Sequence, residues 1–234
     1  MPMLVLWDID HTLLDAGHAG RDAYAAAFET ATGRPLVQPW RFDGRTELAA
    51  ATEVLRAHGL DPADGLLERF LDALVEQFRR RVADIAAAGR ALPGAVAALT
   101  AIGGLREMHQ SVLTGNLYPL AVLKLDAFGL ADHLDLRIGA YGGDAYERTD
   151  LPAHAFARVR RHLGRKHRAR DTVIVGDTLR DVATARAVGA RIVAVATGPV
   201  SAGELAAAGA DVVLADLTDT EATVEAIAGR RRHG

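Results

Sequence analysis

Several residue types on which common enzyme chemistries depend are absent or scarce in this sequence. Its 234 residues include no cysteine, which excludes disulfide bonds, thiolate nucleophiles and cysteine-bound metals. Ser111 and Ser201 are the only serines, and neither lies in the G-x-S-x-G turn of serine hydrolases. The sequence also lacks a P-loop, an H-E-x-x-H zinc motif and a G-x-G-x-x-G motif that opens a helix. Carboxylates therefore remain as its candidate nucleophiles.

Aromatic content and net charge are low as well. Aromatic residues make up 5% of the chain while alanine is abundant, which favours a helix-rich α/β protein over an aromatic-rich β-sandwich. The formal net charge of −3 gives no electrostatic footprint for nucleic acid. The apolar run Met3–Trp7 is too short for a signal peptide, and no apolar stretch is long enough to span a membrane. We therefore expect a cytoplasmic protein, monomer or homodimer, that binds neither nucleic acid nor a membrane.

Strand-like and helix-like segments alternate from Pro93 onward, after one strand at the N-terminus. This alternation predicts a doubly wound parallel sheet, an α/β core of the Rossmann-like kind. The expected strands are Met3–Trp7, a run closed by Ser111–Leu113, Leu134–Gly139, Thr172–Val175, Arg191–Ala196 and Asp211–Leu214. The expected helices are Gly94–Ile102, Pro119–Phe128, Pro152–Leu163, Arg180–Val188, Ser201–Ala208 and Thr220–Ala228.

Residues 17–90 interrupt this alternation. The helical patterns Arg21–Thr32, Thr46–His58 and Asp64–Ala88 follow one another with no strand between them. We therefore predict an α-helical domain, 17–90, inserted between the two parts of one core domain, 1–16 and 91–234. The basic C-terminal residues Arg230–His233 are expected to be a frayed tail.

Polar and charged residues follow several of the predicted strands. Asp8 and Asp10 come after the first, and Asp177 and Asp181 come after Thr172–Val175. Because ligands of open parallel sheets bind beyond the carboxyl ends of the strands, these groups are expected to gather at one edge. The other members of this group are Thr114, Gly115, Asn116 and Arg148.

This set of residues suits a hard cation together with a phosphate. One carboxylate of the pair after the first strand can attack phosphorus, and the other can exchange a proton with the leaving oxygen and with water. Asp177 can bind Mg²⁺ and Asp181 can support it. The backbone amides around Thr114 can cradle phosphate oxygens, and Arg148 can neutralise the charge on the transferred group.

Three segments resemble the motifs of the haloacid dehalogenase-like superfamily, in the same order and spacing. Trp7–Leu14 is similar to its D-x-D-x-T-L nucleophile motif, and Val112–Asn116 to its second motif. Val173–Asp181 is similar to its acidic G-D-x-x-x-D motif. The predicted helical insertion lies where many members carry a helical cap. Within the superfamily, the sequence most resembles the phosphoglycolate phosphatase-like enzymes.

The resemblance assigns roles to these residues. It implies that Asp8 is the nucleophile that becomes an aspartyl phosphate, and that Asp10 is the general acid and base. It implies Mg²⁺ ligands in Asp8, Asp177 and the backbone carbonyl of Asp10, with Asp181 in support, and a phosphate-binding hydroxyl in Thr114. The implied activity is Mg²⁺-dependent hydrolysis of a small phosphorylated metabolite.

The third motif of the family departs from its usual form here. That motif is most often lysine followed by proline, whereas Arg148 and Thr149 stand at the matching distance before Asp177. Arginine keeps the positive charge but has a different shape. Lys124 is the alternative source of this charge, and its larger separation from Asp177 makes us favour Arg148. In the helical insertion, Arg45 of the loop Trp40–Thr46 can reach a substrate carboxylate or phosphate.

Other activities of the same superfamily remain to be weighed. Dehalogenases lack the second acid that Asp10 provides, and phosphonate-cleaving members use a lysine of the cap, whereas residues 17–90 contain no lysine. A phosphomutase shares the acid pair and stays open as an alternative. A non-catalytic binding module also stays open, although a receiver domain is about half this length and has no helical insertion.

Overall fold

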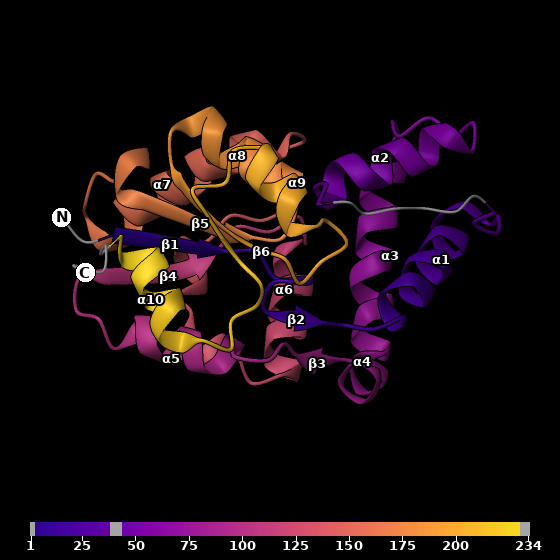
Figure 1. Cartoon of the computed structure of the whole chain (residues 1–234). Coiled ribbons are helices and arrows are strands. Elements are labelled where there is room, and N and C mark those ends of the chain that lie inside the picture. Colours follow the sequence, from indigo (N-terminus) through magenta and orange to yellow (C-terminus); the bar gives the residue numbers. More distant parts are fainter. Residues whose placement is uncertain (1–2, 38–43, 230–234) are drawn as a thin grey trace.

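A five-stranded parallel sheet forms the centre of the protein (Figure 1). The computed structural model describes residues 3–37 and 44–229. The strand order is β4-β1-β5-β6-β7, and each neighbouring pair is parallel. The strands are β1 (Met3–Trp7), β4 (Met108–Val112), β5 (Thr172–Gly176), β6 (Arg191–Val195) and β7 (Val212–Leu214). The predicted doubly wound parallel sheet is therefore confirmed.

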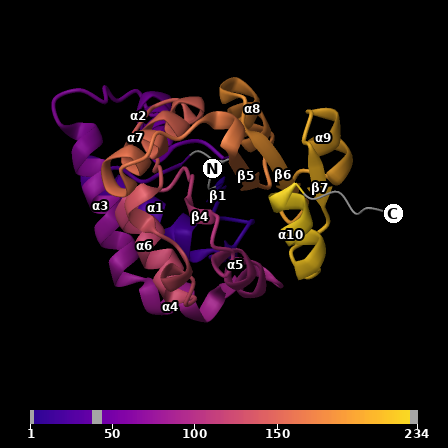
Figure 2. The same ribbon diagram turned by 90° about the vertical axis from the view of Figure 1, so that its left-hand side faces the viewer.

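Helices cover both faces of this sheet (Figure 2). They are α5 (Ala95–Gly103), α6 (Tyr118–Ala127), α7 (Leu151–Leu163), α8 (Leu179–Val188), α9 (Ala202–Ala207) and α10 (Thr220–Ala228). Val5 and Trp7 of β1 pack in one apolar cluster with residues of α5, α6 and α10. Leu4 and Leu6 pack in a second cluster with residues of α7, α8 and α9. Burial on both faces explains why β1 is a continuous apolar run instead of an alternating one.

Four helices stand beyond the carboxyl ends of the strands and form what we call the helical module (Figure 1). They are α1 (Ala19–Thr32), α2 (Glu47–Ala57), α3 (Leu66–Arg80) and α4 (Val82–Ala88). Helices α1 and α3 pack closely, and Phe70 meets Tyr24 and Phe28 edge-on at centroid distances of 5.1 and 5.6 Å. The chain enters and leaves the module through β2 (Leu14–Asp15) and β3 (Arg90–Ala91), which pair antiparallel.

Three details of the sequence-based prediction need correction. The segment Leu134–Gly139 is not a strand: the Asp135 carboxylate accepts a hydrogen bond from the Arg137 amide and caps a short 3-10 turn, Leu136–Ile138. The segment Asp64–Ala88 is two helices, because the chain turns at Arg81 and directs the buried Ile85 inward. The strands β2 and β3 were not predicted, since two residues are too few to carry a periodic pattern.

Some predicted features fall outside the described residues. These are Trp40 to Asp43 of the module loop and the expected tail Arg230–His233. Within the described part of the chain, none of the helices combines the length and the apolar character that crossing a lipid bilayer requires.

The aromatic cluster of the module gives a test of how the module is held together. Phe70 of α3 is fully buried against α1, so we expect Phe70→Ala to lower the free energy of unfolding by about 3–5 kcal/mol. The matched control is Arg79→Ala on the exposed side of α3, which should change it by less than about 0.5 kcal/mol. Urea denaturation measures both, and equal effects would contradict a module held together by this cluster.

Candidate functional site

Three aspartates from different elements meet at the carboxyl edge of the sheet. Asp8 follows β1, Asp177 follows β5, and Asp181 lies in the first turn of α8. Each offers a carboxylate oxygen within 4.8 Å of the others, and all three are buried. The parallel pairing of β1 with β5 places Asp8 beside Asp177, and the Asp8 amide donates to the Val175 carbonyl at 2.8 Å. The fold therefore brings these three carboxylates together at one edge of the sheet, as expected from the sequence.

The chain coils immediately after Asp8, and this separates Asp8 from Asp10. His11 adopts a left-handed conformation with φ of 59°, and its amide donates to the Leu14 carbonyl at 2.8 Å. An extended chain would carry the two carboxylates to the same side of the strand. In the coil, Asp8 faces Asp177, whereas Asp10 turns towards α6. The side chain of His11 is exposed, and the hydroxyl of Thr12 donates to Asp177 at 3.0 Å.

Arg148 is the cation that reaches Asp8. Its Nη2 lies 3.1 Å from a carboxylate oxygen of Asp8 and 2.6 Å from one of Asp181, while Nη1 donates to the Gly44 carbonyl at 3.1 Å. Burial lowers the pKa of Arg148, but the two carboxylates outweigh that and raise it above its usual value. Of the two cations weighed from the sequence, Arg148 is therefore the one that contacts Asp8, and its role as the third-motif charge stays a prediction.

Lys124 contacts Asp10 instead. It projects from α6, and its Nζ lies 2.8 Å from both oxygens of Asp10 and 2.7 Å from the side-chain oxygen of Asn116. Burial raises the pKa of Asp10, but the charge and hydrogen bond of Lys124, with a hydrogen bond from Asn116, outweigh it and hold that pKa below its usual value. In the sequence, the one indication of this contact between Lys124 and Asp10 is the presence of a lysine within an apolar helical segment.

The Thr114-Gly115-Asn116 segment follows β4 and faces the same edge. The Thr114 hydroxyl accepts hydrogen bonds from the amide of Asn116 at 3.2 Å and from its side chain at 2.8 Å. Gly115 has no room for a side chain, because a Cβ there would collide with the Arg45 carbonyl. The backbone of this turn is thereby fixed beside Asp8 and Asp10, all lining one cavity of about 680 Å³.

The aspartate cluster is compatible with a bound metal ion. One oxygen of Asp177 is buried and finds no hydrogen-bond partner among the residues that the structure describes. Burial and the neighbouring carboxylates raise the pKa of both Asp8 and Asp177, so a cation between them would relieve their repulsion. An all-oxygen donor set suits Mg²⁺. The carboxylate of Asp10 lies outside this cluster.

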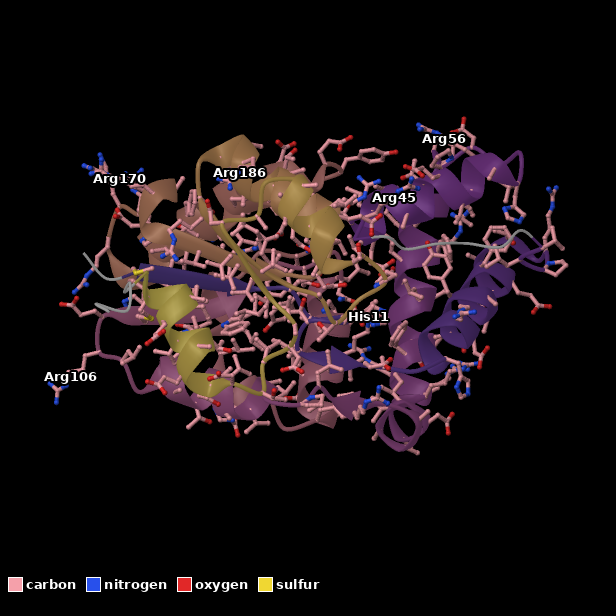
Figure 3. All side chains as sticks on the ribbon, in the orientation of Figure 1. His11, Arg45, Arg56, Arg106, Arg170 and Arg186 are labelled. Atoms are coloured by element: carbon pink, nitrogen blue, oxygen red, sulfur yellow. The ribbon has the colours of Figure 1, made fainter. Side chains whose placement is uncertain are left out.

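The helical module supplies the other wall of the cavity. Arg45 lines it and forms an ion pair with Glu53, and Figure 3 shows Arg45 and His11 where the module meets the core. The amide of Glu47 donates to the Gly115 carbonyl at 2.8 Å, and that of Leu48 to the Gly142 carbonyl at 3.1 Å. These two bonds fix the first turn of α2 against the core.

Glu47 is a cavity residue that the sequence did not single out. It is 8% exposed, and its Oε2 has no hydrogen-bond partner in the described ranges 3–37 and 44–229. Burial raises its pKa to about 7, with Lys124 lowering it and Asp10 raising it. In the sequence, a glutamate after Thr46 is indistinguishable from an ordinary acidic residue in the first turn of a helix.

Comparisons with known proteins agree with this geometry. The model of a hydrolase family, the haloacid dehalogenase-like hydrolases, matches residues 2–189. A phosphoglycolate phosphatase of Chromobacterium violaceum is 29% identical over 221 residues, which cover 92% of this chain and 93% of the relative. A phosphoglycolate phosphatase of Rhodospirillum rubrum is 28% identical over 201 residues, covering 85% of this chain and 81% of the relative.

Solved structures share the fold. A hydrolase from Pseudomonas syringae has a TM-score of 0.71 at 22% identity and covers 96% of this chain and 98% of its own. CbbY from Rhodobacter sphaeroides, solved with phosphate, has a TM-score of 0.71 at 20% identity, covering 94% and 96%. The family model spans more than half of the chain, including all three motif segments. The chain therefore belongs to the haloacid dehalogenase-like hydrolase family.

Proposed function

We propose that this protein hydrolyses a small phosphorylated metabolite with Mg²⁺, through an aspartyl phosphate on Asp8. The observation that carries the proposal is the separation of the two carboxylates after β1. Asp8 lies with Arg148 and the aspartate cluster, while Asp10 is held apart by Lys124 and Asn116. This separation supports a nucleophilic role for Asp8 and a proton-transfer role for Asp10.

In the first step, a carboxylate oxygen of Asp8 forms a bond to phosphorus as the bond between phosphorus and the ester oxygen breaks. Asp10 gives its proton to that departing oxygen, and the product alcohol leaves. This step uses the protonated form of Asp10, which the hydrogen bonds from Lys124 and Asn116 disfavour. Arg148, the Thr114 hydroxyl and the backbone amide of Gly115 stabilise the negative charge on the phosphoryl oxygens. Asp8, Asp177 and the Asp10 carbonyl would hold Mg²⁺, with Asp181 in support, and the ion would neutralise further charge on those oxygens.

In the second step, Asp10 takes a proton from a water molecule whose oxygen attacks the phosphorus of the aspartyl phosphate. The acyl phosphate bond breaks, inorganic phosphate leaves, and Asp8 returns to its carboxylate form. This step needs the ionised form of Asp10. Lys124 and Asn116 favour that form, because both donate hydrogen bonds to its oxygens.

The helical module acts in this proposal as a cap domain of residues 17–90 on a core of residues 1–16 and 91–234. Two backbone hydrogen bonds from the start of α2 to Gly115 and Gly142 support this role, since they bring the module over the phosphate-binding turn. Covering the site excludes bulk water and strengthens the interactions made with the phosphoryl group. A cytoplasmic location and a monomeric or homodimeric state stay predictions.

Removal of the nucleophile gives the first test of this mechanism. We expect Asp8→Asn to lower phosphate release from a panel of phosphomonoesters by about 10³-fold or more, because the amide cannot form the acyl phosphate. EDTA should abolish release by the unaltered protein, and added Mg²⁺ should restore it. The matched control is Asp72→Asn on the exposed side of α3, which should leave the rate unchanged.

The results distinguish the alternatives. Full activity of Asp8→Asn, or of the unaltered protein in EDTA, contradicts the mechanism. Isomerisation of the substrate without release of inorganic phosphate identifies a phosphomutase instead.

Removal of the buried cation gives the second test. Arg148→Met leaves Asp8 and Asp181 without their shared partner, so we expect the free energy of unfolding in EDTA to fall by about 3–5 kcal/mol. We expect kcat/KM to fall by at least about 10²-fold. The Arg186–Asp211 ion pair is partly exposed, so Arg186→Met should cost about 1 kcal/mol or less. Equal losses in the two variants would contradict the role given to Arg148.

A further inference from the structure

Glu47 lines the same cavity as Asp8 and Asp10. It comes from the helical module, whereas the residues that surround the phosphoryl group come from the core. Lys124 lowers the pKa of Glu47 and Asp10 raises it, so both lie within electrostatic range of Glu47. Asp10 is the residue that protonates the leaving oxygen in the proposed function. A substituent on that oxygen would therefore come within reach of Glu47.

The position of Glu47 is fixed by its backbone. Its amide donates to the Gly115 carbonyl at 2.8 Å. The preceding residue, Thr46, caps α2 by accepting from the Ala49 amide at 3.2 Å and donates its hydroxyl proton to the Tyr146 carbonyl at 2.7 Å. Docking of α2 on the phosphate-binding turn therefore carries Glu47 into the cavity.

Burial of the Glu47 carboxyl group costs folding free energy. It is more than nine-tenths buried, and within the described part of the chain one of its oxygens has no hydrogen-bond partner. Burying a carboxyl group without a partner destabilises a fold by several kcal/mol unless something compensates it. A hydrogen-bond donor on a bound ligand would supply that compensation.

Two of the cations that line the cavity, Lys124 and Arg45, are already engaged. An ammonium group has three protons to donate, and Lys124 directs its own at the two oxygens of Asp10 and at Asn116. Arg45 is paired with Glu53. A leaving group that carries a carboxylate would place its negative charge against Glu47, and like charges repel strongly where water is excluded.

We propose that Glu47 determines which leaving groups this enzyme accepts: it accepts a hydrogen bond from a hydroxyl or ammonium group of the leaving group and disfavours a carboxylate. The proposal rests on the proposed phosphatase function and names the substrate class of the same site. The proposal therefore predicts that this enzyme disfavours phosphoglycolate, the compound after which its curated relatives are named. The reason is that the leaving group of phosphoglycolate carries a carboxylate.

The cavity walls strengthen this selection. Phe78 of α3 lies with its ring centroid 5.5 Å from the Lys124 ammonium, and the buried Tyr24 of α1 is close enough for Glu47 to raise its pKa, an effect second to that of burial. Ring carbons cannot replace a missing donor, so an ester that offers no donor forgoes the hydrogen bond to Glu47.

The test compares kcat/KM for four esters on the whole chain with Mg²⁺. The esters are glycerol 1-phosphate with a hydroxyl group, phosphoethanolamine with an ammonium group, phosphoglycolate with a carboxylate, and p-nitrophenyl phosphate with none of these. The unaltered protein should favour the hydroxyl or ammonium ester over phosphoglycolate by about 10-fold or more, the value of one charged hydrogen bond. The preferred ester of the two identifies the donor.

Two variants isolate the carboxyl group. Glu47→Gln removes the charge, keeps an acceptor oxygen, and should lower kcat/KM for the ammonium ester by about 10–100-fold while raising it for phosphoglycolate. Glu47→Met removes the acceptor as well and should also lower the value for the hydroxyl ester. In both variants, p-nitrophenyl phosphate should change by less than about 3-fold, since it offers nothing for Glu47 to accept. Glu68→Gln, on the exposed side of α3, is the matched control.

The outcomes separate this proposal from the function on which it rests. Equal losses on all four esters, together with a lower melting temperature of the variants, mean a structural role for Glu47 and overturn the proposal. Asp8-dependent hydrolysis in which the variants leave the order of the esters unchanged, or in which phosphoglycolate is preferred by the unaltered protein, overturns it alone. Absence of Asp8-dependent phosphate release from every ester overturns the proposed function as well.

Discussion

The ion pairs of the buried Arg148 guanidinium stabilise the carboxylate cluster at the carboxyl edge of the sheet. Three carboxylates lie within 4.8 Å of one another in a region closed to solvent, an arrangement that repulsion and desolvation both oppose. Arg148 bridges two of them, Asp8 and Asp181, with a single nitrogen. The cluster can therefore form in a folded chain, and among the described residues it still keeps an unpaired oxygen on Asp177 for a cation.

The single left-handed residue after β1 divides the labour between two nearby carboxylates. His11 turns the chain back on itself, and as a result Asp8 and Asp10 belong to different hydrogen-bond networks. The network of Asp10 includes Lys124 and Asn116 and favours its ionised form. In the proposed mechanism, two groups of identical chemistry thus take different tasks because their surroundings differ, as is common for acid and base pairs in enzymes.

The sequence predicts the core and its motif residues well because these depend on local patterns. The strands β1 and β5 are continuous apolar runs, and parallel strands place the residues after their carboxyl ends at one edge. The segment Leu134–Gly139 misled the prediction because a side-chain cap at Asp135 outweighed its apolar character. Glu47 and the pairing of Lys124 with Asp10 depend on how the helical module docks, and no periodicity within either helix encodes that contact.

The chain passes between the core and the helical module at a single place, because β2 and β3 lie side by side in a two-stranded ladder. An insertion whose two ends meet imposes no stretch or twist on the strands that carry the aspartates. The residue proposed to select the substrate and the residues proposed to break the phosphate bond therefore lie on different parts of the fold, the helical module and the core. Such a chain can change the compounds it accepts by substitutions in the inserted helices while its reaction chemistry stays the same.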